Sequence, residues 1–337
     1  MTMADDRPMD VARPEVVTLC ECLISLVSPQ PGPLSGVATL HVYPAGAEAN
    51  VAVGLARLGR RVAFVGRVGD DAFGTRIVRA LRGEGVDVGG LTVDPTGPTG
   101  LMIRERRALG PAEVFYARAG SAGSQLGPAD VAAMESRGAL ASARWLHLTG
   151  ITPALSASCR AAVRTALELA RTAGLTVSLD LNLRRRLWSE AQAAVELADL
   201  AGRVDVVIAD EDEATLVSGA RPGLTTEILA QRLLALGPEL VVLKLGARGA
   251  LALERDGEPV PSPGLPVATV IDPVGAGDAF CAGFIDARLD DLDLTDALAR
   301  ANACGAAAVA AEGDQTGLPT RLELVRLLAG SGPDTLR

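Results

Sequence analysis

The sequence has few aromatic residues, few histidines and no long apolar run. Aromatics make up 3% of the 337 residues and the formal net charge is −9, so the chain lacks the stacking platforms and basic surface typical of nucleic-acid-binding proteins. The two histidines form no HExxH metal motif, and His147, in WLHLTG, is expected in the core of a buried strand. No run of about 18 apolar residues predicts a membrane span. We therefore expect neither nucleic acid nor membrane as a partner.

Cysteine is also scarce. The five cysteines are an odd number with no CxxC pair, which argues against a disulfide framework and a structural zinc site. Cys20 and Cys22 are expected on one face of a strand, as core residues. The first residues are acidic and contain proline without the apolar segment of a secretory signal. We expect a disordered tail over residues 1–14 of a cytoplasmic protein.

Strand-like and helix-like segments alternate along most of the chain, which is 48% hydrophobic and can bury a substantial core. VVTLCECLISLV, residues 16–27, is expected to be one buried strand, and AGAEANVAVGLARLG, residues 45–59, a helix that ends at Gly59. The alternation continues to ELVVLKLG, and the last third turns helical. This pattern predicts an α/β domain over residues 15–330, with a mostly parallel sheet covered on both faces.

Two segments interrupt the alternation, residues 30–44 and 97–120. Both contain proline and glycine, and the second contains two short strand-like pieces, TGLMIRE and AEVFYAR, with no helix between them. Paired strands that project from an α/β body form a lid over a site, so we expect a small β-strand lid here. The exposed edges of its strands also leave open a homo-oligomer formed through the lid.

The stretch DPVGAGDAF, Asp272–Phe280, places bare backbone before an acid at the expected start of a helix. GxxxxGK[ST] occurs nowhere, and Phe280 stands where GxGxxG needs its last glycine. What remains is a helix N-terminus whose free N–H groups, at Ala276, Gly277 and Asp278, can face negative charge on a transferred group. The helix N-terminus is expected to keep Asp278 ionised near neutral pH, which suits a base that accepts a proton from a hydroxyl. The turn therefore indicates phosphoryl transfer.

DPVGAGDAFCAGFI resembles the C-terminal signature of the ribokinase-like (PfkB) carbohydrate kinases. AGAEANVAVGLARLG followed by VAFVGRVGDDAFG is similar to their N-terminal signature, and the resemblance runs from about residue 16 to 328. It implies a ribokinase-like three-layer αβα sandwich with a mostly parallel central sheet and a small β-strand lid. It also implies ATP-dependent phosphoryl transfer to a small-molecule substrate, with ATP and Mg²⁺ as cofactors.

The resemblance assigns residues to roles. It implies that the catalytic residues are Gly275, Ala276, Gly277 and Asp278. It implies a substrate site of Gly46, Asn50, Met102, Tyr116, Arg118, Arg184, Asp278 and Asp314. It implies a nucleotide site of Asn182, Arg184, Asp210, Lys244, Gly246, Ala247, Gly249, Gly275, Gly277 and Asn302. Glu213, in the acidic run DEDE, is implied to organise magnesium through water.

Within the family, GAEAN, YARAGSAGS, LHLTGITPALS, SLDLNLRRRLWS, VVLKLGARGA and GDQTGLP are similar to bacterial 2-keto-3-deoxygluconate kinases. This similarity implies a sugar acid as substrate. The planar guanidinium groups of Arg118 and Arg184 suit its carboxylate, whereas Arg185 and Arg186 are expected at the surface. Ser25 stands where many ribokinases and fructokinases have an aspartate, which argues against a ring sugar.

Two alternatives stay open. Close relatives commonly have glycine where Ala45 stands and tyrosine where Met102 and Ala117 stand, and these differences can change which substrate fits. A kinase for a neutral sugar such as fructose or ribose, or for a nucleoside, is the first alternative. A catalytically silent sugar-acid sensor is the second, and it is disfavoured because the chain has both glycines and Asp278 in the turn.

Overall fold

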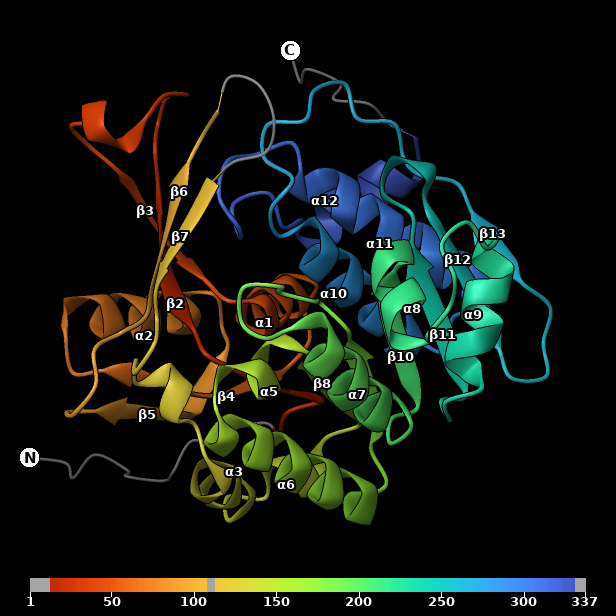
Figure 1. The fold of residues 1–337 in the computed structure, drawn as a ribbon, viewed down its shortest axis with the longest axis horizontal. Coiled ribbons are helices and arrows are strands. Elements are labelled where there is room, and N and C mark those ends of the chain that lie inside the picture. Colours follow the sequence, from red (N-terminus) through yellow and green to blue (C-terminus); the bar gives the residue numbers. More distant parts are fainter. Residues whose placement is uncertain (1–12, 108–112, 331–337) are drawn as a thin grey trace, which may run out of the picture.

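A nine-stranded sheet forms the centre of the part of the chain that this computed structural model describes, residues 13–107 and 113–330 (Figure 1). In the order in which they lie side by side, its strands are β13 (Val260–Ser262), β12 (Ala250–Glu254), β11 (Leu240–Lys244), β10 (Val206–Asp210), β9 (Thr176–Asp180), β8 (Trp145–Thr149), β1 (Val16–Leu19), β4 (Val62–Gly69) and β5 (Asp87–Asp94). The strands from β11 to β5 pair in parallel, which confirms the predicted sheet, and β12 pairs antiparallel with both neighbours. The predicted tail, residues 1–14, lies outside the described residues except for its last two.

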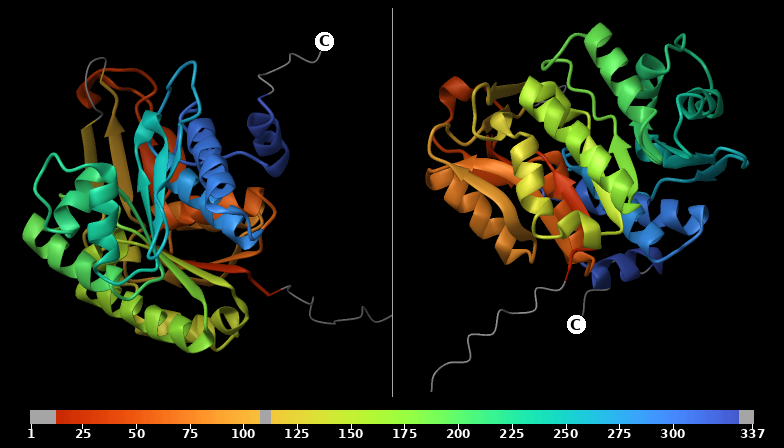
Figure 2. Two further views of the ribbon diagram at one scale, coloured as in Figure 1. Left: turned by 90° about the vertical axis from the view of Figure 1, so that its right-hand side faces the viewer. Right: turned by 90° about the horizontal axis from the view of Figure 1, so that it is seen from below.

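Helices cover both faces of this sheet, so the predicted three-layer arrangement is confirmed (Figure 2). One face carries α3 (Pro128–Glu135), α4 (Ala139–Ser142), α6 (Ala157–Ala173), α7 (Glu190–Ala201), α8 (Glu211–Val217) and α9 (Thr226–Leu234). The other carries α1 (Ala47–Arg57), α2 (Ala72–Gly83), α10 (Ala276–Leu289), α11 (Leu294–Ala308) and α12 (Arg321–Leu328). Shorter pieces are α5 (Ile151–Leu155) and the 3₁₀ turns η1 (Leu34–Gly36), η2 (Gly123–Gln125) and η3 (Gly246–Arg248). Within the described ranges, the structure has no helix whose length and apolar character would let it cross a bilayer.

Helix α6 illustrates how local sequence sets these elements. The hydroxyl of Ser156 accepts a hydrogen bond from the N–H of Cys159 at 3.0 Å and caps the helix start, and Gly174 ends the helix with a φ of 72°. Its buried residues recur three and four positions apart and are Cys159, Ala162, Val163, Ala166, Leu167 and Ala170. This apolar stripe packs on the sheet, since all six belong to the core of that face.

A second sheet, the lid, stands at the upper left of Figure 1. Its strands lie in the order β3 (His41–Ala45), β2 (Leu23–Val27), β6 (Leu101–Glu105) and β7 (Glu113–Ala117). β2 pairs antiparallel with β3 and parallel with β6, and β6 pairs antiparallel with β7. Both strand-like pieces predicted within residues 97–120 are therefore strands of the lid.

The first predicted strand, residues 16–27, is wrong as a single element. Its first part is β1 of the central sheet and its last part is β2 of the lid. The backbone N–H of Cys20 still donates to the carbonyl of Val65 in β4, at 3.0 Å. Four residues later, Ile24 N–H donates to the carbonyl of Gly100 beside β6, also at 3.0 Å. The chain changes sheets between these two bonds, and continuous hydrophobicity does not reveal the change.

Two further expectations about this region need correction. Cys20 and Cys22 lie in the link between the two sheets and not on a strand, although both are buried as expected. Of residues 30–44, only the last four belong to a strand, and η1 precedes them. The prolines at the start of that segment have no N–H to donate to a strand partner, which disfavours an earlier ladder.

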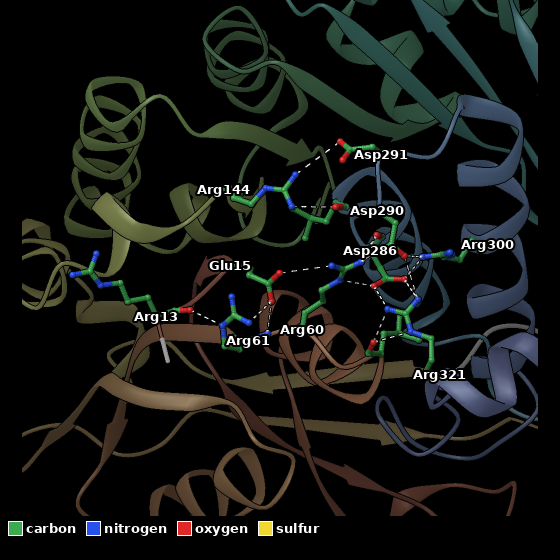
Figure 3. Close-up of polar contacts among 12 residues, drawn as sticks. Arg13, Glu15, Arg60, Arg61, Arg144, Asp286, Asp290, Asp291, Arg300 and Arg321 are labelled. Carbon is green, nitrogen blue, oxygen red and sulfur yellow. Dashed lines mark hydrogen bonds and ion pairs between the residues drawn. The ribbon is translucent and has the colours of Figure 1, made fainter. Parts of the chain in front are cut away.

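A buried carboxylate fixes helix α10, which follows the glycine turn, to its neighbours (Figure 3). Asp286 on α10 is fully buried. It accepts hydrogen bonds from Arg60 Nε at 2.7 Å, Arg300 Nη1 at 2.5 Å and Arg321 Nη2 at 2.6 Å. These arginines lie just before β4, on α11 and on α12. Because three guanidinium groups from separate elements meet one acid, α10 gives the turn firm support.

Candidate active site

A cleft of about 750 Å³ lies between the lid and the carboxyl ends of the central strands. Of the predicted site residues, the cleft brings together Gly46, Asn50, Met102, Tyr116, Arg118, Asn182, Arg184, Asp210, Glu213, Lys244, Gly246, Gly275, Gly277, Asp278 and Asp314. Among the described residues, Ala247, Gly249, Ala276 and Asn302 do not line it. Side chains from both halves of the sequence thus converge on one cleft.

The glycine turn has the bare backbone that its sequence indicates. Gly275 caps α10 with a φ of 82°, and a Cβ there would lie 2.6 Å from the carbonyl oxygen of Asp314. A Cβ on Gly277 would lie 3.4 Å from Lys244 Nζ. The N–H of Ala276 donates to the Pro273 carbonyl at 3.4 Å, whereas those of Gly277 and the next residue have no acceptor among the described residues. Two of the three expected amides are therefore unpaired donors at the helix start.

Asp278 lies in the first turn of α10 and is buried. Asn50 Nδ2 donates to its Oδ2 at 2.8 Å. Burial raises the pKa of Asp278 to about 7, although the Asn50 hydrogen bond and the positive charges of Arg184 and Lys244 lower it. The helix N-terminus was expected to keep this acid ionised near neutral pH, but burial raises its pKa so that it is partly protonated there. A carboxylate with this pKa is matched to proton transfer near neutral pH.

Asn50 lines the cleft, but its amide is used within the protein. Its Oδ1 accepts a hydrogen bond from Gln315 Nε2 at 3.0 Å, while its Nδ2 holds Asp278. Asn50 is on α1, and Gly46 caps that helix with a φ of 141°. The amide therefore fixes the carboxylate of Asp278 through a contact between α1 and α10.

The two arginines expected to bind a carboxylate differ in their surroundings. Arg184 is exposed and lines the cleft, and its guanidinium has no hydrogen-bond or ion-pair partner among the described residues. Arg118 is buried, and its Nε donates to Glu21 Oε2 at 2.7 Å. Glu21 also lines the cleft and was not singled out by sequence reasoning. Arg184 is thus an uncompensated cation in the cleft, while Arg118 already has an anionic partner.

The next two arginines are exposed, as expected, yet both lie at the cleft. Arg185 Nε donates to Glu190 Oε1 at 2.7 Å, on the same side of the body. Arg186 Nη1 donates to the carbonyl of Val114 on β7. Arg186 therefore joins the body to the lid, a role that a purely surface assignment misses.

A buried charge cluster connects the lid to the glycine turn. Arg104, on β6, is 3% exposed, and its Nη1 lies 3.0 Å from Asp272 Oδ2 while its Nη2 lies 3.2 Å from Asp314 Oδ1. Burial raises the pKa of Asp314 to about 6, and the charge of Arg104 lowers it. Sequence reasoning missed Arg104, although it lies two positions after Met102 in a strand and so shares its face.

A second pair lies at the ends of the two strands that flank β10. Lys244 Nζ, at the end of β11, donates to Asp180 Oδ1, at the end of β9, at 2.7 Å. Burial lowers the pKa of Lys244, but the negative charges of Asp180 and its other neighbours, Glu213 among them, together raise it, so the ammonium stays charged. Asn182 follows β9 with a φ of 38° and also faces the cleft. Asp180 was missed because a strand-end acid beside apolar residues gives no motif of its own.

Glu213 and Asp210 form a capping box at the start of α8. Glu213 Oε1 accepts from the N–H of Leu183 at 2.7 Å and its Oε2 from that of Asp210 at 2.9 Å. Burial raises the pKa of Glu213. No group of three or more His, Cys, Asp or Glu side chains in the described ranges could hold a metal ion by itself. The acids at this corner suit a hydrated Mg²⁺ held mainly by phosphate groups, because each oxygen keeps a lone pair for water.

Three of the predicted residues outside the cleft, Ala247, Gly249 and Asn302, lie at a neighbouring loop. Asn302 Nδ2, on α11, donates to the hydroxyl of Ser262 and the carbonyl of Pro263, both at 3.1 Å. Gly249 has a φ of 100°, and a Cβ there would overlap the carbonyl oxygen of Ser262. Ala247 is exposed on η3 between Gly246, which does line the cleft, and this loop. These residues hold the segment after β13 against the edge of the cleft.

The inner face of the lid is mostly apolar. Met102 pairs across β6 and β7 with Tyr116, and both pack with Leu23. Ser25, the neighbour of Met102 on β2, is fully buried, and its hydroxyl finds no hydrogen-bond partner among the residues that the structure describes. It does not line the cleft, so the described structure offers no acidic side chain at this position of the lid.

Comparison with known proteins agrees with this architecture. Residues 13–321 match the family described as pfkB family carbohydrate kinase. A 2-dehydro-3-deoxygluconokinase of Bacillus subtilis is 38% identical over 94% of this chain and 95% of its own length. Another of Thermoproteus tenax is 39% identical over 93% of this chain and 94% of its own length.

Solved structures are similar as well. One is an E. coli protein described as a ribokinase II, solved in complex with ATP and Mg²⁺. It is 26% identical, has a TM-score of 0.84, and the match covers 94% of this chain and 99% of that one. The chain belongs to the pfkB family of carbohydrate kinases.

Proposed function

We propose that this kinase transfers the γ-phosphoryl group of ATP to the 6-hydroxyl of 2-keto-3-deoxy-D-gluconate, with Mg²⁺ as metal cofactor. The observation that carries the proposal is Asp278, a buried carboxylate with a pKa of about 7 beside unpaired helix amides. The uncompensated guanidinium of Arg184 in the same cleft favours an acidic substrate. The two curated relatives named above are kinases of this sugar acid, which supports the same substrate.

Asp278 accepts the proton of the 6-hydroxyl. The sugar oxygen then bonds to the γ-phosphorus, the bond from that phosphorus to the bridging oxygen breaks, and ADP leaves. Asn50 holds Asp278 Oδ2, so the other oxygen, Oδ1, is left to receive the proton. The amides of Gly277 and Asp278 and the ammonium of Lys244 offset the negative charge of the transferred group.

The cleft residues that the transfer step does not use are assigned to the nucleotide and the metal. Gly246 and Gly277 leave the backbone open on either side of Lys244, which suits the close approach of a triphosphate. Mg²⁺ supplies charge neutralisation for the phosphates when it is bound. Asp210 and Glu213, at the same edge of the cleft, are the acids that would hold its water shell.

The sugar acid occupies the lid side of the cleft in this proposal. Its carboxylate meets Arg184, with Arg118 as a second donor, and its hydroxyls meet Asp314. Met102 and Tyr116 cover its carbon chain. Arg118 and Arg104 form buried ion pairs with Glu21 and Asp272, and these pairs reduce the net positive charge of the pocket. For this reason a neutral sugar remains the alternative substrate.

The test is a coupled assay for ADP release with purified protein, ATP and Mg²⁺. The panel contains 2-keto-3-deoxy-D-gluconate, its galactonate epimer, fructose, ribose and a nucleoside. Turnover of the first acid with the highest kcat/KM supports the proposal. Turnover of fructose or ribose without turnover of the acid would refute the proposed substrate but not the kinase activity. No turnover of any compound, with nucleotide binding intact, would favour a sensor.

We further propose that two copies pair through the lid. β3 and β7 are the outer strands of the lid sheet and have free edges in the described structure. Phe115, on β7, is 43% exposed, and Ile103 and Leu26 lie next to it in register on the same face. Light scattering of the wild type and of Phe115→Glu tests this, with a dimer expected to become a monomer in the variant; a monomeric wild type would overturn it.

We place the reaction in the cytoplasm, where ATP is abundant. The cysteines of the described structure are all free thiols and buried, which suits a reducing compartment. Cell fractionation with an antibody to the chain tests this location, and recovery in the extracellular fraction would contradict it.

A further inference from the structure

Glu21 is a buried acid in the cleft wall for which the proposed phosphoryl transfer has no use. It is 1% exposed and lies in the link between β1 and β2. Its Oε2 accepts from Arg118 Nε at 2.7 Å, and its Oε1 accepts from Ser121 Oγ at 2.5 Å. Burying a carboxylate costs free energy unless it is paired, and this one is paired on both oxygens.

Every chain crossing between body and lid contacts Glu21. In the described residues the chain crosses four times, and Glu21 itself lies in the first crossing. A Cβ on Gly46, in the second, would lie 2.7 Å from its backbone oxygen, and a Cβ on Gly100, in the third, would overlap its carboxylate. In the fourth, Arg118 binds the carboxylate and a Cβ on Gly123 would overlap its side chain. Glu21 is therefore enclosed by the whole base of the lid.

The same contact fixes the direction of Arg118. Nε and Nη2 both lie against Glu21 Oε2, at 2.7 and 2.5 Å, so Glu21 occupies one side of the guanidinium group. The ring of Tyr116 lies under the group, with Arg118 Cζ 5.3 Å from its centroid. Nη1 has no hydrogen-bond partner among the described residues, and Arg118 lines the cleft. The planar group thus keeps its outer edge for a ligand.

We propose that Glu21 is a positioning residue of the ligand site, which orients Arg118 toward the ligand and sets the lid in place at its base. The identity of the ligand as a sugar acid rests on the proposed function, but the contacts of Glu21 do not. Glu21 acts through Arg118 and the lid and touches no reacting atom in this scheme. Its removal therefore affects ligand binding more than the chemical step.

Glu21→Gln tests the role because glutamine keeps the shape and removes the charge. We expect KM for the sugar acid to rise about tenfold or more, the size of one lost charge-assisted contact. KM for ATP should change less than about twofold and kcat less than KM. The matched control is Asp130→Asn, which removes a buried carboxylate paired with Arg67 away from the cleft. It should lower the melting temperature without changing either KM.

Gly123→Ala provides a second variant that leaves the carboxylate in place. Its methyl group would press on the Glu21 side chain, so we expect the same selective rise in KM for the sugar acid. In a background of Arg118→Ala, Glu21→Gln should add less than about a twofold change, because residues that act through one another are not additive. Additive losses would show that Glu21 acts independently of Arg118.

Hydrogen exchange without ligand separates this proposal from the proposed function. In Glu21→Gln, peptides that cover residues 97–105 and 113–124 should exchange faster than in wild type, and in Asp130→Asn they should not. If wild type does not phosphorylate the acid, the substrate proposal fails, and the exchange pattern still decides the role of Glu21. Unchanged exchange in the lid, or equal rises in KM for both substrates, would overturn the inference.

Discussion

Asn50 Nδ2 donates to Asp278 Oδ2 across a contact between α1 and α10, at 2.8 Å. This bond gives one carboxylate oxygen a fixed partner and leaves the other to accept a proton. We expect Asp278→Asn to lower kcat by about 10²–10⁴-fold, the range for loss of a general base, with little change in nucleotide affinity. Steady-state kinetics and a nucleotide-binding titration measure the two quantities, and near-normal turnover would refute the assignment.

Asp278→Asn should also change how the stability of the protein depends on pH. Because burial raises the pKa of Asp278 to about 7, the folded protein binds this proton more tightly than the unfolded chain does. The stabilisation is fully present below about pH 4 and is lost as pH rises through about 7. Asp278→Asn lacks this titration, so its melting temperature relative to wild type should rise between about pH 5 and pH 8. A difference that stays constant over this range contradicts a raised pKa.

Gly277 has no side chain, so its amide is accessible from the cleft. A side chain at this position would contact the ammonium of Lys244. We expect Gly277→Val to raise KM for ATP and lower kcat together, since the methyl groups block both the amide and the approach of phosphate. Gly85→Ala is the control for a glycine substitution outside the cleft, because Gly85, unlike Gly277, has a positive φ, of 82°, and a Cβ there meets open space after α2. The control should affect stability alone. A normal KM for ATP in Gly277→Val would show that the turn does not bind the nucleotide.

The guanidinium of Arg184 has no protein partner in the described structure, and Arg184 lines the cleft. In Arg184→Lys the planar two-pronged donor becomes a point charge, so we expect at least a tenfold loss of kcat/KM for the sugar acid and little change in ATP binding. Arg185→Lys is the matched control, because Arg185 is already paired with Glu190. Equal losses of kcat/KM for the sugar acid and of affinity for ATP would show that Arg184 does not bind the carboxylate of the acid specifically.

Asp286 is the centre of the ion-pair network behind the turn (Figure 3). Asp286→Ala leaves three guanidinium groups with only the less buried Asp290 as a shared acid, and we expect about 3–5 kcal/mol of lost unfolding free energy. Asp291→Ala, which removes an exposed acid 3.9 Å from Arg144, should change little. Denaturant unfolding at fixed pH compares the two, and similar losses would show that the network does not stabilise α10.

The alternating pattern was enough to predict the class of fold, and the glycine turn was enough to predict that Asp278 lies in the cleft. Periodicity identified helices such as α6, and DPVGAGD identified the start of α10. The pattern failed at the switch between β1 and β2, since both strands are buried and read as one apolar run. Strands β5, β12 and β13 were not predicted either: β5 contains two glycines, ALALE of β12 has no β-branched or aromatic residue, and β13 has three residues.

The site was predicted best where a residue stands in a motif and worst where only tertiary contact gives it meaning. Asp278 and Gly277 belong to a motif and lie in the cleft as expected. Glu21, Arg104 and Asp180 carry no motif, and each is defined by a partner distant in the sequence. The pKa of Asp278 was also beyond reach, because the depth of burial depends on elements that pack only in the folded chain.

The parallel pairing of β2 with β6 has a consequence for the order in which the molecule is made. The two strands are separated in sequence by β3, α1, β4, α2 and β5, so their ladder cannot close until the intervening part has emerged and docked. Helix α10 is synthesised much later still. A nascent chain therefore contains every lid strand well before it contains Asp278, so the proposed catalytic base is among the later parts of the cleft to be synthesised.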